Sequence, residues 1–263
     1  MTTHIPDKSL AFNQGVLIFI YLAALTALEF FIAVTFQSVI ILIVVAVIKA
    51  ALVMYYYMHI YKLNESSDDD DTHSYAYKTG TNRLGLWLFL LSDSFVFGGL
   101  MAARINLLGF NRPPLNQLLG LAVTAVLLLS SFFMNRGETA MAHGDTKGFL
   151  NNVTVTFFLG LGFLVGVVAV EWRLAAQEGL IASFGDPAHG PMGGVFYIMT
   201  GMHAFHVFTG LIFLFVVWNK ARKNIYSAEK HWGVEAAAVY WHFVDLVWIF
   251  YYPALYLIGK LIV

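Results

Sequence analysis

Several ionisable side chains lie inside long apolar stretches of the chain, where they are candidates for chemistry. His203 and His206 occur in TGMHAFHVFTG, and His242 and Asp245 occur in YWHFVDLVW. Residues three positions apart share one face of a helix, so each pair groups two polar side chains. Histidine is a common ligand of both metals and haem iron. Two hypotheses stay open: a metal or haem site, or a hydrogen-bond network that joins two helices.

Three further charged residues lie deep in apolar stretches. Asp93 stands in LLSDSFVFGG with no cation within a helical turn. A charge in the bilayer is costly, so Asp93 is expected to be protonated, paired across helices, or facing a water-filled or headgroup cleft. Glu29 and Lys49 lie on the two arms of one hairpin, at depths that differ by roughly one helical turn. They are expected to form an ion pair that fixes the hairpin; alternatively, one of them meets a partner subunit.

The stretches that carry these residues are long enough to cross a membrane as helices. Apolar residues make up 59% of the 263 residues, charged residues make up 12%, and the mean hydropathy is +0.71. A helical span needs about 20 mostly apolar residues. Seven stretches qualify, and we predict an all-α polytopic membrane protein with seven transmembrane helices, at 13–35, 39–60, 84–107, 115–135, 149–173, 192–218 and 235–260.

Composition also excludes several classes of function. The formal net charge is -1, which provides no basic field for nucleic acid. The chain has no cysteine, so disulfides, thiolate metal sites and a cysteine nucleophile are excluded. The first residues lack the basic region of a signal peptide, so the first span is expected to remain in the protein.

A polar segment, 61–82, divides the chain into two parts. It contains four consecutive aspartates and is predicted to be an acidic linker between a two-helix hairpin (1–60) and a five-helix bundle (83–263). Lys and Arg are more frequent on the membrane face that carries the N-terminus than on the opposite face. The positive-inside rule therefore predicts a cytoplasmic N-terminus, a cytoplasmic linker and a C-terminus outside.

The longest motifs resemble a known family. TGMHAFHVFTG, followed by HWGVEAAAVYWHFVDLVWIFYYPALYLIG, resembles the C-terminal signature of haem-copper oxidase subunit III. Glu171-Trp172 and GPMGGVFYIMTG match that family too, and LLSDSFVFGG matches the segment that carries its intramembrane carboxylate. An aspartate at that position, Asp93, and five spans after the linker resemble the five-helix bacterial branch. The resemblance covers about residues 80–263.

The N-terminal hairpin resembles a different subunit of the same oxidases. LTALEFFIAV followed by VIKAALVMYYYMHI is similar to the small bacterial subunit IV, in which a lysine and a Met-His motif recur, here Lys49 and Met58-His59. The resemblance implies a subunit IV-like hairpin fused to a subunit III bundle, with the acidic linker as the joint.

The resemblance implies a non-catalytic subunit of a proton-pumping terminal oxidase in the bacterial plasma membrane. The complex would oxidise cytochrome c or a quinol and reduce dioxygen to water. Haem and copper would lie in partner subunits I and II, and this chain would bind no cofactor except phospholipids. It would stabilise subunit I, its main partner, and contact subunit II; other subunits of the respiratory complex are further candidate partners. Asp93 would support proton uptake.

The resemblance also assigns the other polar residues. It favours an interhelical polar network of His203, His206, His242, Asp245 and Glu235 over a metal site. Residues near span ends are expected to bind lipid: Arg173, Glu171, Trp172, Arg222 and Lys223. The alternatives are a stand-alone membrane haem protein or a proton channel or transporter. A haem spectrum of the isolated chain would favour the first, and paired inverted repeats, which the sequence lacks, would favour the second.

Overall fold

Long membrane-spanning helices dominate the computed structural model, which describes residues 7–36, 38–64 and 74–261. Among these residues, seven helices are long and apolar enough to cross a membrane, which confirms the predicted fold class. Two spans end in π-helical turns and one contains such a turn. The elements are α1 (Lys8–Thr35), α2 (Val39–Leu52), η1 (Val53–Tyr57), η2 (Ile60–Asn64), α3 (Tyr75–Leu108), β1 (Asn111–Arg112), α4 (Gln117–Ala142), α5 (Thr146–Val165), η3 (Gly166–Glu171), α6 (Trp172–Gln177), α7 (Met192–Arg222), α8 (Trp232–Tyr252), η4 (Pro253–Leu257) and β2 (Lys260–Leu261).

Four of the long helices begin at a capping side chain. Asp7, Ser74, Asn116 and Asp145 accept hydrogen bonds from backbone N–H groups in the first turns of α1, α3, α4 and α5. Such caps satisfy donors that have no partner within the helix. The cap at Ser74 starts α3 inside the predicted linker 61–82, so the third span is longer than predicted. The four aspartates at 68–71 lie outside the described residues.

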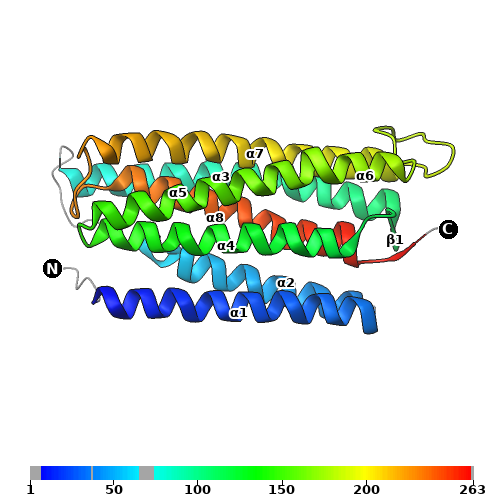
Figure 1. Ribbon diagram of the computed structural model, residues 1–263, viewed down its shortest axis with the longest axis horizontal. Coiled ribbons are helices and arrows are strands. Elements are labelled where there is room, and N and C mark those ends of the chain that lie inside the picture. Colours follow the sequence, from blue (N-terminus) through cyan, green and yellow to red (C-terminus); the bar gives the residue numbers. More distant parts are fainter. Residues whose placement is uncertain (1–6, 37, 65–73, 262–263) are drawn as a thin grey trace.

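The helix α8 lies at the centre of the molecule (Figure 1), and 78% of the residues in its most apolar window are buried. Its Trp241 packs against Gly160 of α5 and Gly210 of α7, where an added Cβ would meet the indole ring at 2.4 and 2.9 Å. The indole N–H of Trp241 donates to Ser130 of α4 at 3.0 Å. Small residues on the neighbouring helices thus make room for a large ring on the central helix.

The hairpin of α1 and α2 lies along one side of the molecule, and α7 lies on the opposite side (Figure 1). The helix α1 packs against α4, and α2 with η1 packs against α8. The helix α3 contacts α7 and α8, but only 11% of its most apolar window is buried. A membrane helix with so much apolar surface uncovered must face lipid or another protein chain.

The last span ends earlier than predicted. Pro253 lacks a backbone N–H and begins the π-helical turn η4, which ends at Leu257. The chain then forms β2, whose Lys260 and Leu261 pair in parallel with Asn111 and Arg112 of β1. The C-terminal residues therefore close the end of the bundle instead of extending α8 to residue 260.

Candidate functional site

The intramembrane carboxylate Asp93 of α3 faces a histidine of α7. Its Oδ2 lies 3.5 Å from Nε2 of His206, and the two side chains are 20% and 12% exposed. The ring of Phe97 packs edge-on against His206 with centroids 4.7 Å apart. Of the three environments expected for Asp93, the structure provides pairing across helices. The partner is one of the predicted site histidines.

The hydrogen bonds of His206 define what the pair can do. Its Nδ1 lies 2.8 Å from the carbonyl oxygen of Met202. A carbonyl only accepts, so Nδ1 carries a hydrogen and Nε2 is the atom left to face Asp93. If both groups are deprotonated, a lone pair faces a carboxylate, whereas one added proton makes the contact attractive.

The other two predicted histidines are buried among aromatic rings. The His203 ring lies 4.9 Å from that of Trp248, and the His242 ring lies 5.0 Å from that of Tyr57. Neither side chain finds a hydrogen-bond partner in the described part of the chain. In that same part, no three His, Asp or Glu side chains gather closely enough to hold a metal ion. The two rings contribute to the packing of α7 and α8.

The boundary between hairpin and bundle contains buried charges. Lys49 of α2 donates a hydrogen bond to Glu29 of α1, and their side chains are 2% and 0% exposed. Asp245 of α8 is also buried and is close enough to Lys49 to interact electrostatically. One ammonium therefore neutralises a carboxylate within the hairpin and attracts a second one on the central helix. The structure brings Glu29 and Lys49 together, and it places Asp245 within electrostatic reach of Lys49.

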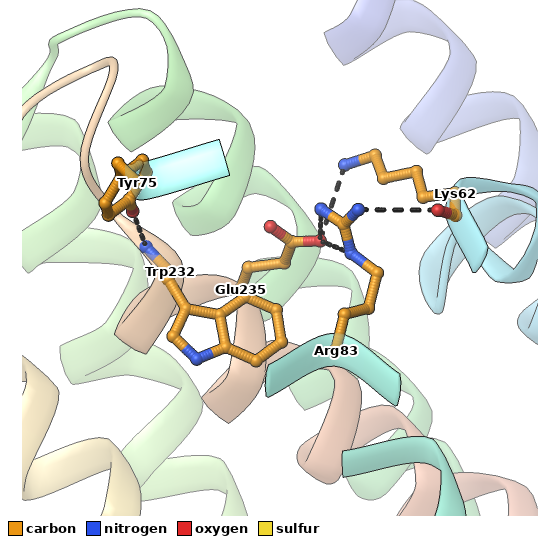
Figure 2. A network of polar contacts seen from close by, with 5 residues as sticks. All are labelled: Lys62, Tyr75, Arg83, Trp232 and Glu235. Atoms are coloured by element: carbon orange, nitrogen blue, oxygen red, sulfur yellow. Dashed lines mark hydrogen bonds and ion pairs between the residues drawn. The ribbon is translucent and has the colours of Figure 1, made fainter. Parts of the chain in front are cut away.

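Glu235, near the start of α8, joins three segments at the membrane face that carries the N-terminus (Figure 2). Its Oε1 accepts from Arg83 of α3 at 2.9 and 3.1 Å and lies 3.9 Å from Nζ of Lys62 in η2. Nearby, the Tyr75 hydroxyl accepts from the backbone N–H of Trp232 at 3.1 Å. The two ends of the predicted linker are thus held together on α8. The five residues predicted to form one network are thus separated in the structure. His206 faces Asp93, Asp245 interacts with Lys49, and Glu235 binds Arg83. The other two, His203 and His242, pack among aromatic rings.

A second ion pair at this face joins the starts of α1 and α5. The ammonium of Lys8 lies 2.7 Å from Oδ2 of Asp145. This hydrogen bond is the main reason that the pKa of Asp145 lies below its ordinary value. His59, which follows η1, is held in its neutral form by burial. Burial lowers the pKa of His59 to about 3, and the positive charge of Lys62 adds to the decrease. His59 is therefore neutral at physiological pH.

Arg104 is a buried residue whose role the sequence did not predict. It lies near the end of α3 with 2% of its surface exposed. Its guanidinium donates to four carbonyl oxygens, those of Ala254, Gly109, Asn111 and Ile258, at 2.7–3.1 Å. It thereby satisfies carbonyls left open by the π-helical turn and the connections around it. An arginine inside the predicted span 84–107 is the feature of the sequence that could have indicated a buried side chain with several partners.

The predicted lipid-binding residues lie in different environments. The guanidinium of Arg222 stacks on the Trp218 ring at 4.7 Å, at the edge of an apolar groove between α5 and α7. Lys223 and Arg173 are exposed, whereas Glu171 is buried. The indole of Trp172 points into the bundle and donates to Thr200 of α7 at 3.1 Å.

Comparison with known proteins adds an independent observation. A family model described as cytochrome c oxidase subunit III matches residues 4–260, which include the N-terminal hairpin. The cytochrome c oxidase subunit 3 of Thermostichus vulcanus is 38% identical over 184 residues, which cover 67% of this chain and 87% of that protein. The same subunit of a Synechocystis strain is 31% identical over 204 residues, which cover 74% and 84%. That of Equus caballus is 35% identical over 191 residues, which cover 68% and 70%.

Proposed function

Because the chain belongs to the cytochrome c oxidase subunit III family, and is thus a subunit III of a haem-copper oxidase, we propose that it supports catalysis in partner subunits without a redox centre of its own. In this proposal, it binds and stabilises subunit I, holds phospholipids and assists proton uptake. Haem and copper lie in subunits I and II, and the complex reduces dioxygen to water while pumping protons.

The Asp93–His206 pair is the observation that supports a role in proton uptake. It joins two helices and lies at the edge of the bundle, with the Asp93 side chain 20% exposed. In this proposal, a proton that reaches the partly exposed Asp93 carboxyl is held between it and Nε2 of His206, where it makes their contact attractive. Asp93 is therefore our candidate for the proton-handling carboxyl of this subunit.

The uncovered face of α3 supports association with another membrane chain. Gly98 and Gly99 lie there with open space around their Cα atoms, and small residues let another helix approach closely. We place the partner subunit on this face. The orientation that follows from Lys and Arg, with the N-terminus in the cytoplasm of a bacterial cell, belongs to the same proposal, as does the origin of the hairpin from a subunit IV.

Co-purification tests this function. We would add an affinity tag to the chain, extract native membranes with a mild detergent, and identify the retained proteins together with their haem spectrum. The expected result is a complex that contains subunits I and II, in which removal of those subunits also removes the Soret band. A Soret band stoichiometric with this chain alone, or a tagged chain that retains no oxidase subunit, would overturn the proposal.

A further inference from the structure

Three buried ionisable side chains meet where the hairpin packs against the central helix α8. Glu29 of α1, Lys49 of α2 and Asp245 of α8 are all buried. Lys49 donates a hydrogen bond to Glu29 and lies within electrostatic reach of Asp245. All three belong to helices that are long and apolar enough to cross the membrane. Their charges therefore have to be compensated inside the protein, because a charge within the bilayer is costly.

The charges of these three groups do not balance when both carboxyls are ionised, because two carboxylates then face one ammonium. Among the described residues, the other groups that interact with Asp245 include the Ser131 hydroxyl of α4 and the Tyr57 side chain of η1, and neither is a cation. A buried carboxylate without its own cation carries a large desolvation penalty. One more positive charge is needed, and a proton can supply it.

The hydrogen bonds around Asp245 fit a neutral acid. Its Oδ2 is buried without a hydrogen-bond partner among the described residues. The Tyr57 hydroxyl donates to the carbonyl oxygen of Gly15 at 3.3 Å, so its hydrogen is already used. The Ser131 hydroxyl can accept a hydrogen bond from a protonated carboxyl as well as donate one to an ionised carboxyl. With so few donors around it, the carboxyl gains little from being ionised.

His242 is the other group near Asp245 that could take the proton. It lies three residues before Asp245 and shares its helix face. Its ring packs against that of Tyr57, and neither ring nitrogen has a hydrogen-bond partner among the described residues. An imidazolium at this position would bury N–H donors without acceptors. The carboxyl of Asp245, which faces Ser131, is the better place for the proton.

We propose that Glu29, Lys49 and Asp245 form a buried site that binds one proton, so that two carboxyls share one ammonium and one added proton. In the loaded state Asp245 is neutral and Lys49 pairs with Glu29. When the proton leaves, the carboxylate on α8 competes with Glu29 for the same ammonium. The site thereby links proton binding to the contact between hairpin and bundle. It is separate from the Asp93–His206 pair, which joins α3 and α7, and it does not depend on the function proposed above.

Infrared spectroscopy can count the protonated carboxyls of this site. The full-length tagged chain is purified with the subunits it retains, and the spectrum of each variant is subtracted from that of the wild type at neutral pH. Protonated carboxyls elsewhere are common to both spectra and cancel. Asp245→Asn should remove the C=O band of one carboxylic acid, a band that shifts in D₂O. Identical carboxylic-acid bands in the two proteins would overturn the proposal.

Two further variants test the charge balance, because an isolated protonated aspartate would not respond to its neighbours in this way. Glu29→Gln frees Lys49 to pair with Asp245, so the acid band should disappear although Asp245 is still present. Lys49→Met removes the cation of the site, so a second carboxyl should take up a proton and the band should grow by about one carboxylic acid. A band that persists unchanged in Glu29→Gln would refute the shared site.

A matched control separates this effect from a general loss of carboxyl groups. Glu229→Gln makes the same chemical change at an exposed position outside the spans and should leave the band unchanged. An equal loss of the band in Glu229→Gln would contradict its assignment to this site. If Lys49→Met does not assemble, Glu29→Gln and Asp245→Asn still decide, since both replace a carboxyl by a neutral amide of similar shape. Loss of the partner subunits from the wild-type chain would refute the proposed function but would leave the expected bands the same.

Discussion

A histidine that donates one ring hydrogen to its own helix has a single nitrogen left for other chemistry. His206 is in this state, because Nδ1 donates to the carbonyl of Met202 and Nε2 faces Asp93. His203 differs, because aromatic rings surround it and its nitrogens meet no polar group in the described structure. Two residues of one i, i+3 pair therefore have different surroundings: His206 faces a carboxylate, and His203 packs among aromatic rings.

The residue scale makes a direct prediction for Asp93. In Asp93→Asn the side chain can still donate a hydrogen bond to Nε2 of His206, so assembly should persist, but the carboxyl proposed to hold the proton is lost. We expect slower proton uptake and a shorter lifetime of the oxidase during turnover. The decrease should be smaller than the roughly 100-fold loss caused by removing a direct acid–base group. Stopped-flow proton uptake by reconstituted oxidase measures this, and unchanged uptake and lifetime would remove Asp93 from the mechanism.

His59 gives a pH-dependent prediction. Burial lowers its folded pKa to about 3, whereas the unfolded pKa is about 6.5. The unfolded chain therefore takes up a proton below pH 6.5 that the folded chain refuses. The stability linked to His59 is complete above pH 6.5 and falls as the pH decreases toward 3, by at most about 1.4 kcal/mol per pH unit.

The variant His59→Asn separates this effect from other titrations. His59 has a φ of 50°, a conformation that asparagine tolerates. The variant should show a smaller loss of stability between pH 7 and pH 5 than the wild type, measured as the midpoint of unfolding in SDS. Parallel pH profiles of the two proteins would show that His59 does not control this range.

At the scale of elements, polar groups compensate each irregularity in the helices. The π-helical turn η4 leaves carbonyls without helical partners, and Arg104 of α3 donates to two of them while Arg112 and Gln117 donate to a third, that of Tyr256. In the hairpin, a charged side chain likewise compensates a buried polar group. Its buried Lys49 has a carboxylate partner on α1, because an unpaired ammonium in the membrane would be costly.

The hairpin ion pair leads to an asymmetric prediction. Lys49→Met should destabilise the protein by about 3–5 kcal/mol, because it leaves the carboxylate of Glu29 buried without its cation. The double variant Glu29→Gln with Lys49→Met should recover most of this loss, since no charge remains unpaired in the hairpin. Unfolding in SDS measures the free energies of unfolding of the wild type, of each single variant and of the double variant. Additive losses in the double variant would show that the two side chains do not interact.

At the scale of the whole molecule, α8 connects the parts. It contacts α4 and α7, and α2 and η1 of the hairpin also pack against it. The apolar and ionic contacts on α1 and α2 do not depend on the covalent connection at residues 65–73. A protease site introduced there should therefore be cleaved without separation of the two pieces. Co-elution in size-exclusion chromatography tests this, and Lys49→Met in the cleaved protein should promote dissociation. Separation of the wild-type pieces would contradict the contribution of these contacts.

The sequence by itself determined the membrane class, the seven spans and the family. Lipid offers no hydrogen bonds, so each span must satisfy its own backbone and cover itself with apolar residues, and this requirement is visible along the chain. The pairing of Glu29 with Lys49 could also be predicted, because two arms of one hairpin fix the relative depth of their residues.

Only the tertiary structure decided which helix faces meet. The sequence grouped His206 and Asp245 in one predicted polar network, yet the packed helices place His206 against Asp93 and bring Asp245 within electrostatic reach of Lys49 in the hairpin. For the same reason, the four carbonyls around Arg104 could not be predicted. Sequence periodicity shows that a helix is apolar all round, but side-chain partners depend on crossing angles and rotations that long-range packing selects.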